Sequence, residues 1–301
     1  MFDDLRLGDL KTFGLVIRHG GFSAASRACA TPQTTISKRV ASLEQALGVK
    51  LLHRTPRQVR LTEDGQRVYA WVRRLLDDVS DMGDELAAAR GEPVGPLRIS
   101  ASMRLGRAYV APVLAALKRD HPALDITLDI VDRPVNLVAE GLHLDVRTGE
   151  PTEPGLIGHR IFCSERILCA SPDYLRAHGQ PSDFEALREH RCLLFKDRID
   201  PPGLWRLHGP RGWETMSVRS DLTSNDNEVV LTWAEAGLGI MLATDWFFAD
   251  SLASGRLARV LPGWSQPADV WVVSASRTAQ SAKVRVFIER LRAEMAARLA
   301  C

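Results

Sequence analysis

The chain has 301 residues, 45% hydrophobic and 25% charged, which suits a globular protein with more than one apolar core. Its apolar runs are too short to cross a membrane and its acidic N-terminus lacks the apolar centre of a signal peptide, so we expect a cytoplasmic protein without membrane contact. The cysteines show no CxxC or Cys–His pairing, which favours reduced thiols over a metal or redox site (Cys29, Cys163, Cys169, Cys192 and Cys301).

The net charge of +2 is unevenly distributed along the chain. Residues 1–60 contain ten Lys or Arg and four acidic residues, a charge of +6, which leaves −4 for the remaining residues. A basic segment attached to a mildly acidic body is typical of a nucleic-acid-binding domain joined to another function. The alternative is an ordinary imbalance of solvated surface charge.

The N-terminal segment predicts three helices joined by short turns. The first covers about residues 8–19, where apolar residues recur at helical spacing, and a Gly-Gly pair ends it. The second, at 22–28, is rich in small residues and has Ser23 as its expected N-cap. The third has Thr31 as its expected N-cap and Pro32 at its first position, and its apolar stripe runs to Gly48 (Ile36, Val40, Leu43 and Leu47).

Residues 49–61 change to the pattern of two short strands around Thr55-Pro56-Arg57. Two close helices followed by a basic strand-turn-strand segment are the layout of a winged helix-turn-helix, which places one helix in the major groove of DNA. We therefore expect residues 1–61 to form a DNA-binding domain.

A long helix is predicted at 62–89, with Thr62 as its cap and two acidic residues in its first turn. It would span roughly 40 Å. Its apolar residues form a nearly heptad stripe, which favours a coiled coil between two copies of the chain over packing on its own domain (Val68, Val72, Leu75, Val79, Met82 and Leu86).

After a hinge rich in Gly and Pro at 90–96, strands and helices alternate through residues 97–301. This alternation predicts mostly parallel sheets covered by helices in two α/β lobes, lobe I at about 97–163 and 269–301 and lobe II at about 164–268. Beyond the first elements, strands are expected at 156–162, 165–171, 191–195, 238–243 and 269–275, and helices at 183–189, 226–236, 244–253 and 279–299.

Several sequence blocks are similar to those of LysR-type transcriptional regulators. In the N-terminal part they are LxxF at 10–13, GGFSAAS at 20–26, ISKRVASLE at 36–44, LGVKLLHRT at 47–55 and RLTEDGQ at 60–66. In the rest of the chain they are LRIS at 97–100, LVAEGLHLDVRTG at 137–149, CASPDYLRAHGQP at 169–181 and EAGLGIMLATDW at 235–246. One departure is His143, where the family commonly has aspartate, with Asp145 two residues later.

The resemblance implies a multidomain α+β and α/β protein. Its parts would be an N-terminal winged helix-turn-helix, a linker helix and a two-lobed Rossmann-like effector domain of the periplasmic-binding-protein type. The implied partners are double-stranded promoter DNA, a small-molecule effector, further copies in a homodimer or homotetramer, and RNA polymerase if the protein is an activator. No cofactor is implied.

The exposed start of the third helix is expected to meet base edges, and its short and amide side chains can donate and accept hydrogen bonds there. The residues expected to contact DNA there are Thr31, Gln33, Thr34, Thr35 and Ser37, flanked by Lys38 and Arg39, for which both guanine and phosphate are open as partners. Arg54, Arg57 and Arg60 on the wing are expected to hold backbone phosphates. The alternatives are helix capping for Thr34 and Thr35 and solvated loop charge for the arginines.

Polar residues at strand ends predict an effector site between the lobes, because ligands of open α/β sheets bind at the carboxyl ends of strands. The expected residues are Ser100, Ser102, Met103, Arg147, Thr148, Phe195, Ser224 and Asn225. Backbone N–H groups of the helix after Asn225 would hold an anion, and Arg147 would pair with a carboxylate of a small organic acid. The alternatives are neutralisation of Arg147 by Asp145, and a plain core role for Phe195 and Trp205.

Two other classes of function fit the sequence less well. A two-lobed solute-binding module would share the fold of the C-terminal part but not residues 1–90. An enzyme is not expected, because the sequence contains no GxSxG nucleophile elbow, phosphate-binding loop or metal-ligand spacing.

Overall fold

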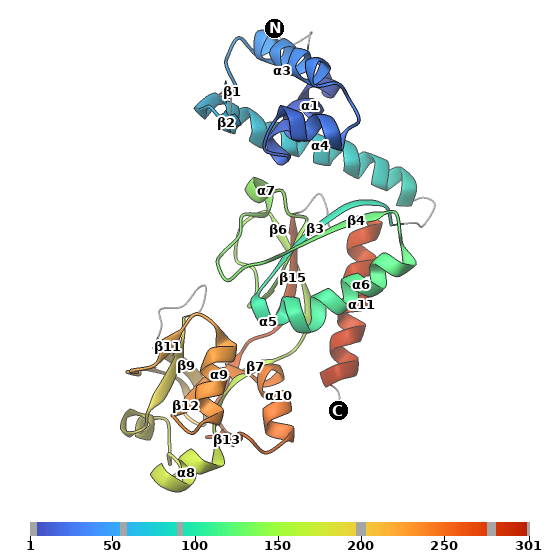
Figure 1. Ribbon diagram of the computed structural model, residues 1–301. Coiled ribbons are helices and arrows are strands. Elements are labelled where there is room, and N and C mark those ends of the chain that lie inside the picture. The colour runs from blue at the N-terminus through green and yellow to red at the C-terminus, as the bar shows by residue number, and fades with distance from the viewer. Residues whose placement is uncertain (1–4, 55–58, 89–92, 197–202, 276–280, 300–301) are drawn as a thin grey trace. The chain divides into compact units, whose positions relative to one another are not determined.

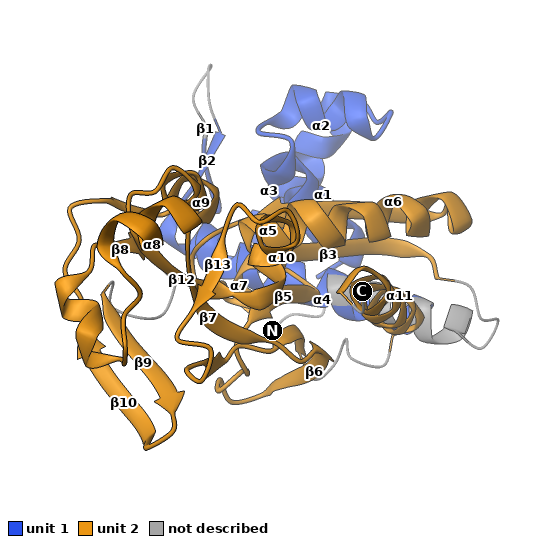
Figure 2. Cartoon of the chain, turned by 90° about the horizontal axis from the view of Figure 1, so that it is seen from below, with its two compact units in different colours: residues 1–86 blue, residues 87–301 orange. Residues whose placement is uncertain are grey.

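The computed structural model describes residues 5–54, 59–88, 93–196, 203–275 and 281–299. The chain forms two compact units, residues 1–86 and 87–301 (Figures 1 and 2). Each unit is built around its own apolar core and is described by itself.

The first unit is a winged helix-turn-helix, as predicted. Three helices pack around Phe13, Val16, Val40 and Leu43, and an antiparallel pair of short strands follows them. The elements are α1 (Leu7–Arg18), α2 (Phe22–Ala28), α3 (Gln33–Leu47), β1 (Leu52–Arg54), β2 (Val59–Leu61) and α4 (Glu63–Ala88).

Two predicted helix caps are wrong. The N-cap of α2 is Gly21, and Ser23 lies inside the helix, where its hydroxyl donates to Gln33 Oε1 at 2.9 Å. The N-cap of α3 is Pro32, and the Thr31 hydroxyl instead donates to the carbonyl of Cys29 at 3.0 Å. Both side chains stabilise the turn between α2 and α3, where a local hydrogen bond competes with capping.

Helix α4 divides its apolar residues between two environments. Val72 is buried in the core of the first unit, with Val68 and Leu76 packed beside it. Leu75, Val79 and Met82 are 43%, 42% and 59% exposed. The Thr62 hydroxyl accepts the N–H of Gly65 at 2.8 Å and caps the helix as predicted. Part of the predicted apolar stripe therefore packs in the core of the first unit, and the rest is exposed.

Lobe I of the second unit is a five-stranded sheet in the order β4-β3-β5-β15-β6, with helices on its faces. A continuous helical segment starts at Met103 and contains one π-helical turn at Gly106–Val110; the sequence pattern predicts its start only at about residue 107. The elements are β3 (Gly95–Ala101), α5 (Met103–Leu105), α6 (Ala111–Asp120), β4 (Leu124–Ile130), α7 (Leu137–Glu140), β5 (Leu144–Thr148), β6 (Leu156–Phe162), β15 (Val270–Ala275) and α11 (Ala282–Leu299).

Lobe II is a second sheet in the order β11-β8-β12-β7-β13, to which β14 adds by pairing with β7. Helix α8 and the hairpin β9-β10 were not predicted. The elements are β7 (Glu165–Ala170), α8 (Pro172–His178), a 3-10 helix (Glu185–Glu189), β8 (Cys192–Phe195), β9 (Leu204–Gly209), β10 (Gly212–Ser217), β11 (Thr223–Ser224), α9 (Asn227–Glu235), β12 (Ile240–Thr244), α10 (Asp245–Ala253), β13 (Ala258–Val260) and β14 (Gln266–Pro267).

Both sheets are mixed, so the prediction of mostly parallel sheets is wrong. In lobe I, β3 pairs in parallel with β4 and β5, but β15 is antiparallel to β5 and β6. In lobe II, β7 is antiparallel to β12, β13 and β14. The antiparallel strands adjoin the two points at which the chain crosses between lobes, where Ala268 N–H donates to the Ser164 carbonyl at 2.8 Å.

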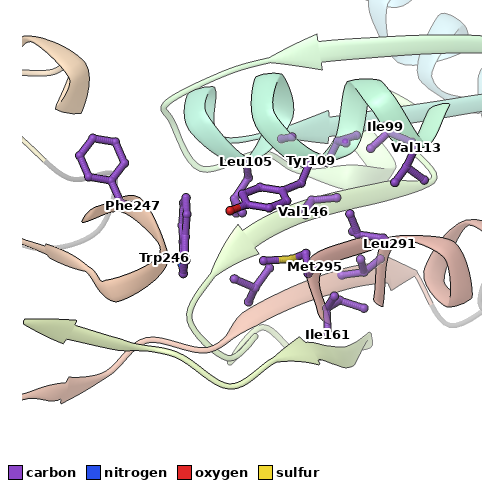
Figure 3. Packing of buried hydrophobic residues seen from close by; sticks show 14 of the residues in the cluster. Ile99, Leu105, Tyr109, Val113, Val146, Ile161, Trp246, Phe247, Leu291 and Met295 are labelled. Atoms are coloured by element: carbon purple, nitrogen blue, oxygen red, sulfur yellow. The ribbon is translucent and has the colours of Figure 1, made fainter. Parts of the chain in front are cut away.

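The two lobes share one apolar cluster (Figure 3). The Tyr109 ring of lobe I meets the Trp246 ring of lobe II edge to face, with centroids 5.8 Å apart. Edge-to-face pairs add about 1 kcal/mol to the contribution of the buried area. Trp246 and Phe247 also line the cavity described below.

Candidate functional site

The exposed side of α3 carries the residues predicted to meet DNA. Gln33, Thr34 and Lys38 are exposed, and Thr35 and Ser37 are half-buried. Thr34 and Lys38 are four residues apart and therefore share one face of the helix, opposite the buried stripe that begins with Ile36. This face presents hydroxyl, methyl and ammonium groups to solvent.

Several of the predicted residues, among them Gln33, Arg39 and Thr31, have hydrogen-bond partners within the domain. The hydroxyl of Ser23 donates to Gln33 Oε1, which orients the amide and leaves its NH₂ group for other acceptors. Arg39 Nη1 lies 3.5 Å from the hydroxyl of Thr12 on α1, so its guanidinium is directed along the flank of α3. Thr31, which caps nothing, belongs to the turn before α3.

The wing arginines are only partly described. Arg54 ends β1, but its side chain is outside the described part of the structure, as is the whole of Arg57. Arg60 lies on β2 and is exposed. Their assignment to phosphates stays a prediction.

Glu44 attaches the wing to α3, and the sequence analysis missed it. Its buried carboxylate accepts the N–H groups of Leu51 and Leu52 at 2.9 and 3.3 Å and the ammonium of Lys50 at 2.9 Å. Burial by itself raises the pKa of Glu44, but these hydrogen bonds outweigh it and lower the pKa overall. A glutamate directly after the apolar Leu43 was the available signal.

A cavity of about 990 Å³ lies between the two lobes of the second unit. Its walls combine apolar and aromatic side chains with five arginines and five carboxylates. The charged lining residues are Arg104, Arg107, Arg147, Arg166, Arg206, Asp132, Glu150, Glu153, Asp226 and Glu228. A concave site of this size with a few convergent polar groups is typical of small-molecule binding.

Five of the eight predicted effector residues line this cavity: Ser102, Met103, Arg147, Thr148 and Phe195. Trp205 lines it as well, although it is also buried in the core of lobe II. The structure therefore places residues from two strand ends of lobe I opposite an aromatic wall of lobe II.

Ser100, Ser224 and Asn225 do not line the cavity, contrary to expectation. Ser100 is completely buried, and its hydroxyl donates to Asp145 Oδ1 at 2.7 Å. The hydroxyl of Ser224 accepts the N–H of Asp226 at 3.0 Å. Asn225 is exposed but lies outside the lining residues.

The start of α9, where an anion was expected to bind, carries acidic side chains of the protein itself. The carboxylate of Asp226 caps this helix by accepting the N–H of Glu228 at 2.9 Å. Glu228 adds a second acidic group in the first turn and forms an ion pair with Arg104 of lobe I. The favourable position for an anion is thus held by the protein's own carboxylates.

Arg147 has a carboxylate partner that the sequence analysis did not identify. Its Nη1 and Nη2 donate to the two oxygens of Glu153 at 2.9 and 2.7 Å, a bidentate pair. Asp145, the expected competitor, is more distant, with Oδ2 3.8 Å from Nη1. The hydrogen bonds from Arg147 are the main reason that the pKa of Glu153 is lowered to about 2.

The lobe II wall contributes further residues that were not predicted. The guanidinium of Arg206 on β9 lies 4.7 Å from the centre of the Trp213 ring on β10, a cation–π contact. Arg104 approaches the Phe247 ring at 5.2 Å while it pairs with Glu228. Within the described ranges, no three His, Cys, Asp or Glu side chains gather as a metal ion would require, and no helix has the length and hydropathy to span a membrane.

Comparison with known protein families identifies both parts of the chain. Residues 7–66 match the bacterial regulatory helix-turn-helix domain of the lysR family, and residues 90–296 match the LysR substrate binding domain. The helix-turn-helix match favours a regulator over a solute-binding module.

Individual proteins agree with this assignment. The chain is 45% identical to the HTH-type transcriptional regulator DmlR of Escherichia coli K12, over 95% of this chain and 93% of that one. It is 35% identical to the transcriptional activator TtdR of the same strain, over 95% and 92%. The full-length activator AphB of Vibrio cholerae matches with a TM-score of 0.59 and 30% identity, over 95% and 98%. CrgA of Neisseria meningitidis matches with a TM-score of 0.61 and 28% identity, over 97% and 99%. The chain therefore belongs to the LysR family of transcriptional regulators, which are DNA-binding proteins with an effector-binding domain and not enzymes.

Proposed function

We propose that the effector of this regulator is a small organic acid that binds between the lobes, with its carboxylate on Arg147. The observation that carries the proposal is a guanidinium that is only 11% exposed and lines a cavity large enough for such a molecule. Ser102 and Thr148 lie on the same wall and supply hydroxyl groups. A carboxylate in bidentate geometry is the preferred partner of a partly desolvated arginine.

The proposal is tested by a thermal-shift screen of the full chain against small carboxylic acids. A ligand present at a hundred times its dissociation constant adds about 2.7 kcal/mol to the free energy of unfolding. The stabilisation should disappear in Arg147→Ala and persist in Arg206→Ala, which removes a guanidinium from the opposite wall. If only Arg206→Ala abolished the stabilisation, the acid would bind to lobe II instead. If only neutral compounds stabilised the chain, the proposal of a carboxylate effector would be refuted.

We further propose that α3 reads bases through Gln33, Thr34, Thr35, Ser37 and Lys38, and that Arg39 and the wing arginines contact phosphates. The exposed face of Thr34 and Lys38 supports this assignment. A duplex selected from a random library would provide the operator for anisotropy titrations. Thr34→Val should lower the ratio of specific to random-sequence affinity, whereas replacement of a phosphate-binding arginine on the wing should weaken both affinities equally.

The exposed part of α4 suggests how two copies assemble. Leu75, Val79 and Met82 recur at helical spacing, and we propose that they pack against the same residues of a second copy in a homodimer or a homotetramer built from dimers. Such a dimer would bind a two-fold promoter site in the cytoplasm, and would contact RNA polymerase if the regulator is an activator. Sedimentation of Val79→Asp should show a shift toward monomer.

A further inference from the structure

We infer that Glu153 is a resident carboxylate that an acidic effector must displace from Arg147, so that this residue sets the affinity for carboxylates and couples binding to movement of residues 149–155. The inference rests on the proposed carboxylate effector. It adds a second, competing residue and a direction of movement.

Glu153 occupies the bidentate position of the Arg147 guanidinium. Both terminal nitrogens of Arg147 are already engaged by the two oxygens of Glu153, at 2.9 and 2.7 Å. A second carboxylate cannot take the same bidentate position while Glu153 keeps it. Binding in this Nη1/Nη2 position is therefore an exchange of one carboxylate for another.

The surroundings of Arg147 are already rich in negative charge. Asp145 is buried with Oδ2 3.8 Å from Arg147 Nη1, so one guanidinium already faces two carboxylates. An effector that bound beside them would place three negative groups around one positive group. Repulsion between like charges in a partly desolvated site opposes that arrangement, and departure of Glu153 removes it.

The loop that carries Glu153 has a glycine at each end. Glu153 lies between Gly149 and Gly155, whose φ angles are +96° and +79°, a backbone conformation that glycine adopts without strain. A Cβ added at either glycine would meet nothing within 4 Å, whereas the Gly149 N–H donates to the Asp269 carbonyl at 2.9 Å, so movement would begin after this residue. The Glu153 side chain is 48% exposed, so water can solvate its carboxylate after release.

Glu150 provides a matched control. It lies in the same loop, lines the same cavity and carries the same charge, but no ion pair joins it to any described residue. Glu150→Gln therefore removes a negative charge without freeing Arg147, whereas Glu153→Gln removes the competitor. Because Glu153 is half-exposed, both variants should fold as the parent chain does.

The experiment is titration calorimetry of the full chain with acetate, lactate and succinate, and with the corresponding amides as neutral probes. Glu153→Gln should bind the carboxylates about fivefold more tightly, because an ion pair of about 1 kcal/mol, whose carboxylate is 48% exposed, no longer competes. Glu150→Gln removes a charge from the same cavity without freeing Arg147, so it should tighten carboxylate binding by less than Glu153→Gln does. The neutral amides should bind the parent chain and both variants with equal affinity. In hydrogen exchange, a bound carboxylate should speed the amides of residues 149–155 in the parent chain, because Thr152 N–H loses its bond to Glu153.

Three outcomes would be decisive. Equal or weaker carboxylate binding in Glu153→Gln, with binding still lost in Arg147→Ala, would overturn this inference and leave the proposed function standing. Slower hydrogen exchange of the amides of residues 149–155 after ligand binding would also overturn the inference, because the effector would then bind beside Glu153. Failure of every carboxylate to bind any variant would refute the proposed effector itself.

Discussion

His143 makes the stability of the second unit sensitive to acid. Its ring is almost completely buried beside β3, and Nδ1 accepts the N–H of Arg98 at 3.0 Å. Burial, with the nearby charges of Lys283 and Arg98, lowers the pKa of His143 from 6.5 to about 3. Protonation would place a charge in the interior and break the hydrogen bond from Arg98.

The sign of the effect follows from linkage. Because the folded pKa lies below the unfolded value, the unfolded chain binds more protons between pH 6.5 and 3, and stability falls as the pH drops through that range. At pH 5 the unfolded ring is almost fully protonated and the folded ring is neutral. The loss relative to pH 7 is then about 2 kcal/mol, at about 1.4 kcal/mol per pH unit.

The assay compares the full chain with His143→Asn, whose Oδ1 can replace Nδ1 as the acceptor but does not titrate. Urea unfolding is followed by tryptophan fluorescence, which reports mainly on the second unit because Trp71 is the single tryptophan of the first. The difference between the two unfolding free energies should change by about 2 kcal/mol from pH 7 to pH 5. Parallel pH profiles would refute the reasoning, since the other histidines are common to both chains.

Three further predictions concern the first unit. Glu44→Ala leaves the N–H groups of Leu51 and Leu52 without their acceptor and should cost about 2–4 kcal/mol, measured by thermal unfolding, with loss of DNA affinity; an unchanged melting temperature would contradict it. Gly65→Ala places a Cβ 2.0 Å from the Leu51 carbonyl oxygen and should destabilise the unit by about 1–3 kcal/mol; wild-type stability would show that the backbone shifts freely there. Arg54→Ala should weaken binding to all duplexes and reduce the salt slope by about 1, as measured by anisotropy across a salt series; a loss confined to the operator would argue for base reading.

Sequence patterns predicted the local structure correctly wherever interactions between neighbouring residues determine it. The apolar spacing in α3 and the cap at Thr62 depend on residues within one or two helical turns, and both are present as predicted. The two strands of the wing and the alternation of strands and helices in the second unit were also predicted from the sequence. They led to the correct fold class because a few local signals recur in the order that this architecture requires.

Which residues cap the helices depends on competition between nearby hydrogen-bond partners. Which residues line the cavity depends on contacts between segments far apart in the sequence. Ser23 could cap α2, but it donates to Gln33 instead, because the turn brings α3 beside it. Ser100 and Ser102 look equivalent in the sequence, yet only Ser102 lines the cavity, since Asp145 on the neighbouring strand accepts the Ser100 hydroxyl.

The chain by itself determined the class of protein, the two-part organisation and the presence of a polar site at the strand ends of lobe I. Only the tertiary structure decided which charges meet there. Arg147 was identified from its position at a strand end, but its partner Glu153 depends on the path of a loop, and Arg206 depends on an unpredicted hairpin. Periodicity reports which face of an element is buried, whereas an ion pair depends on where two separate backbones place their side chains.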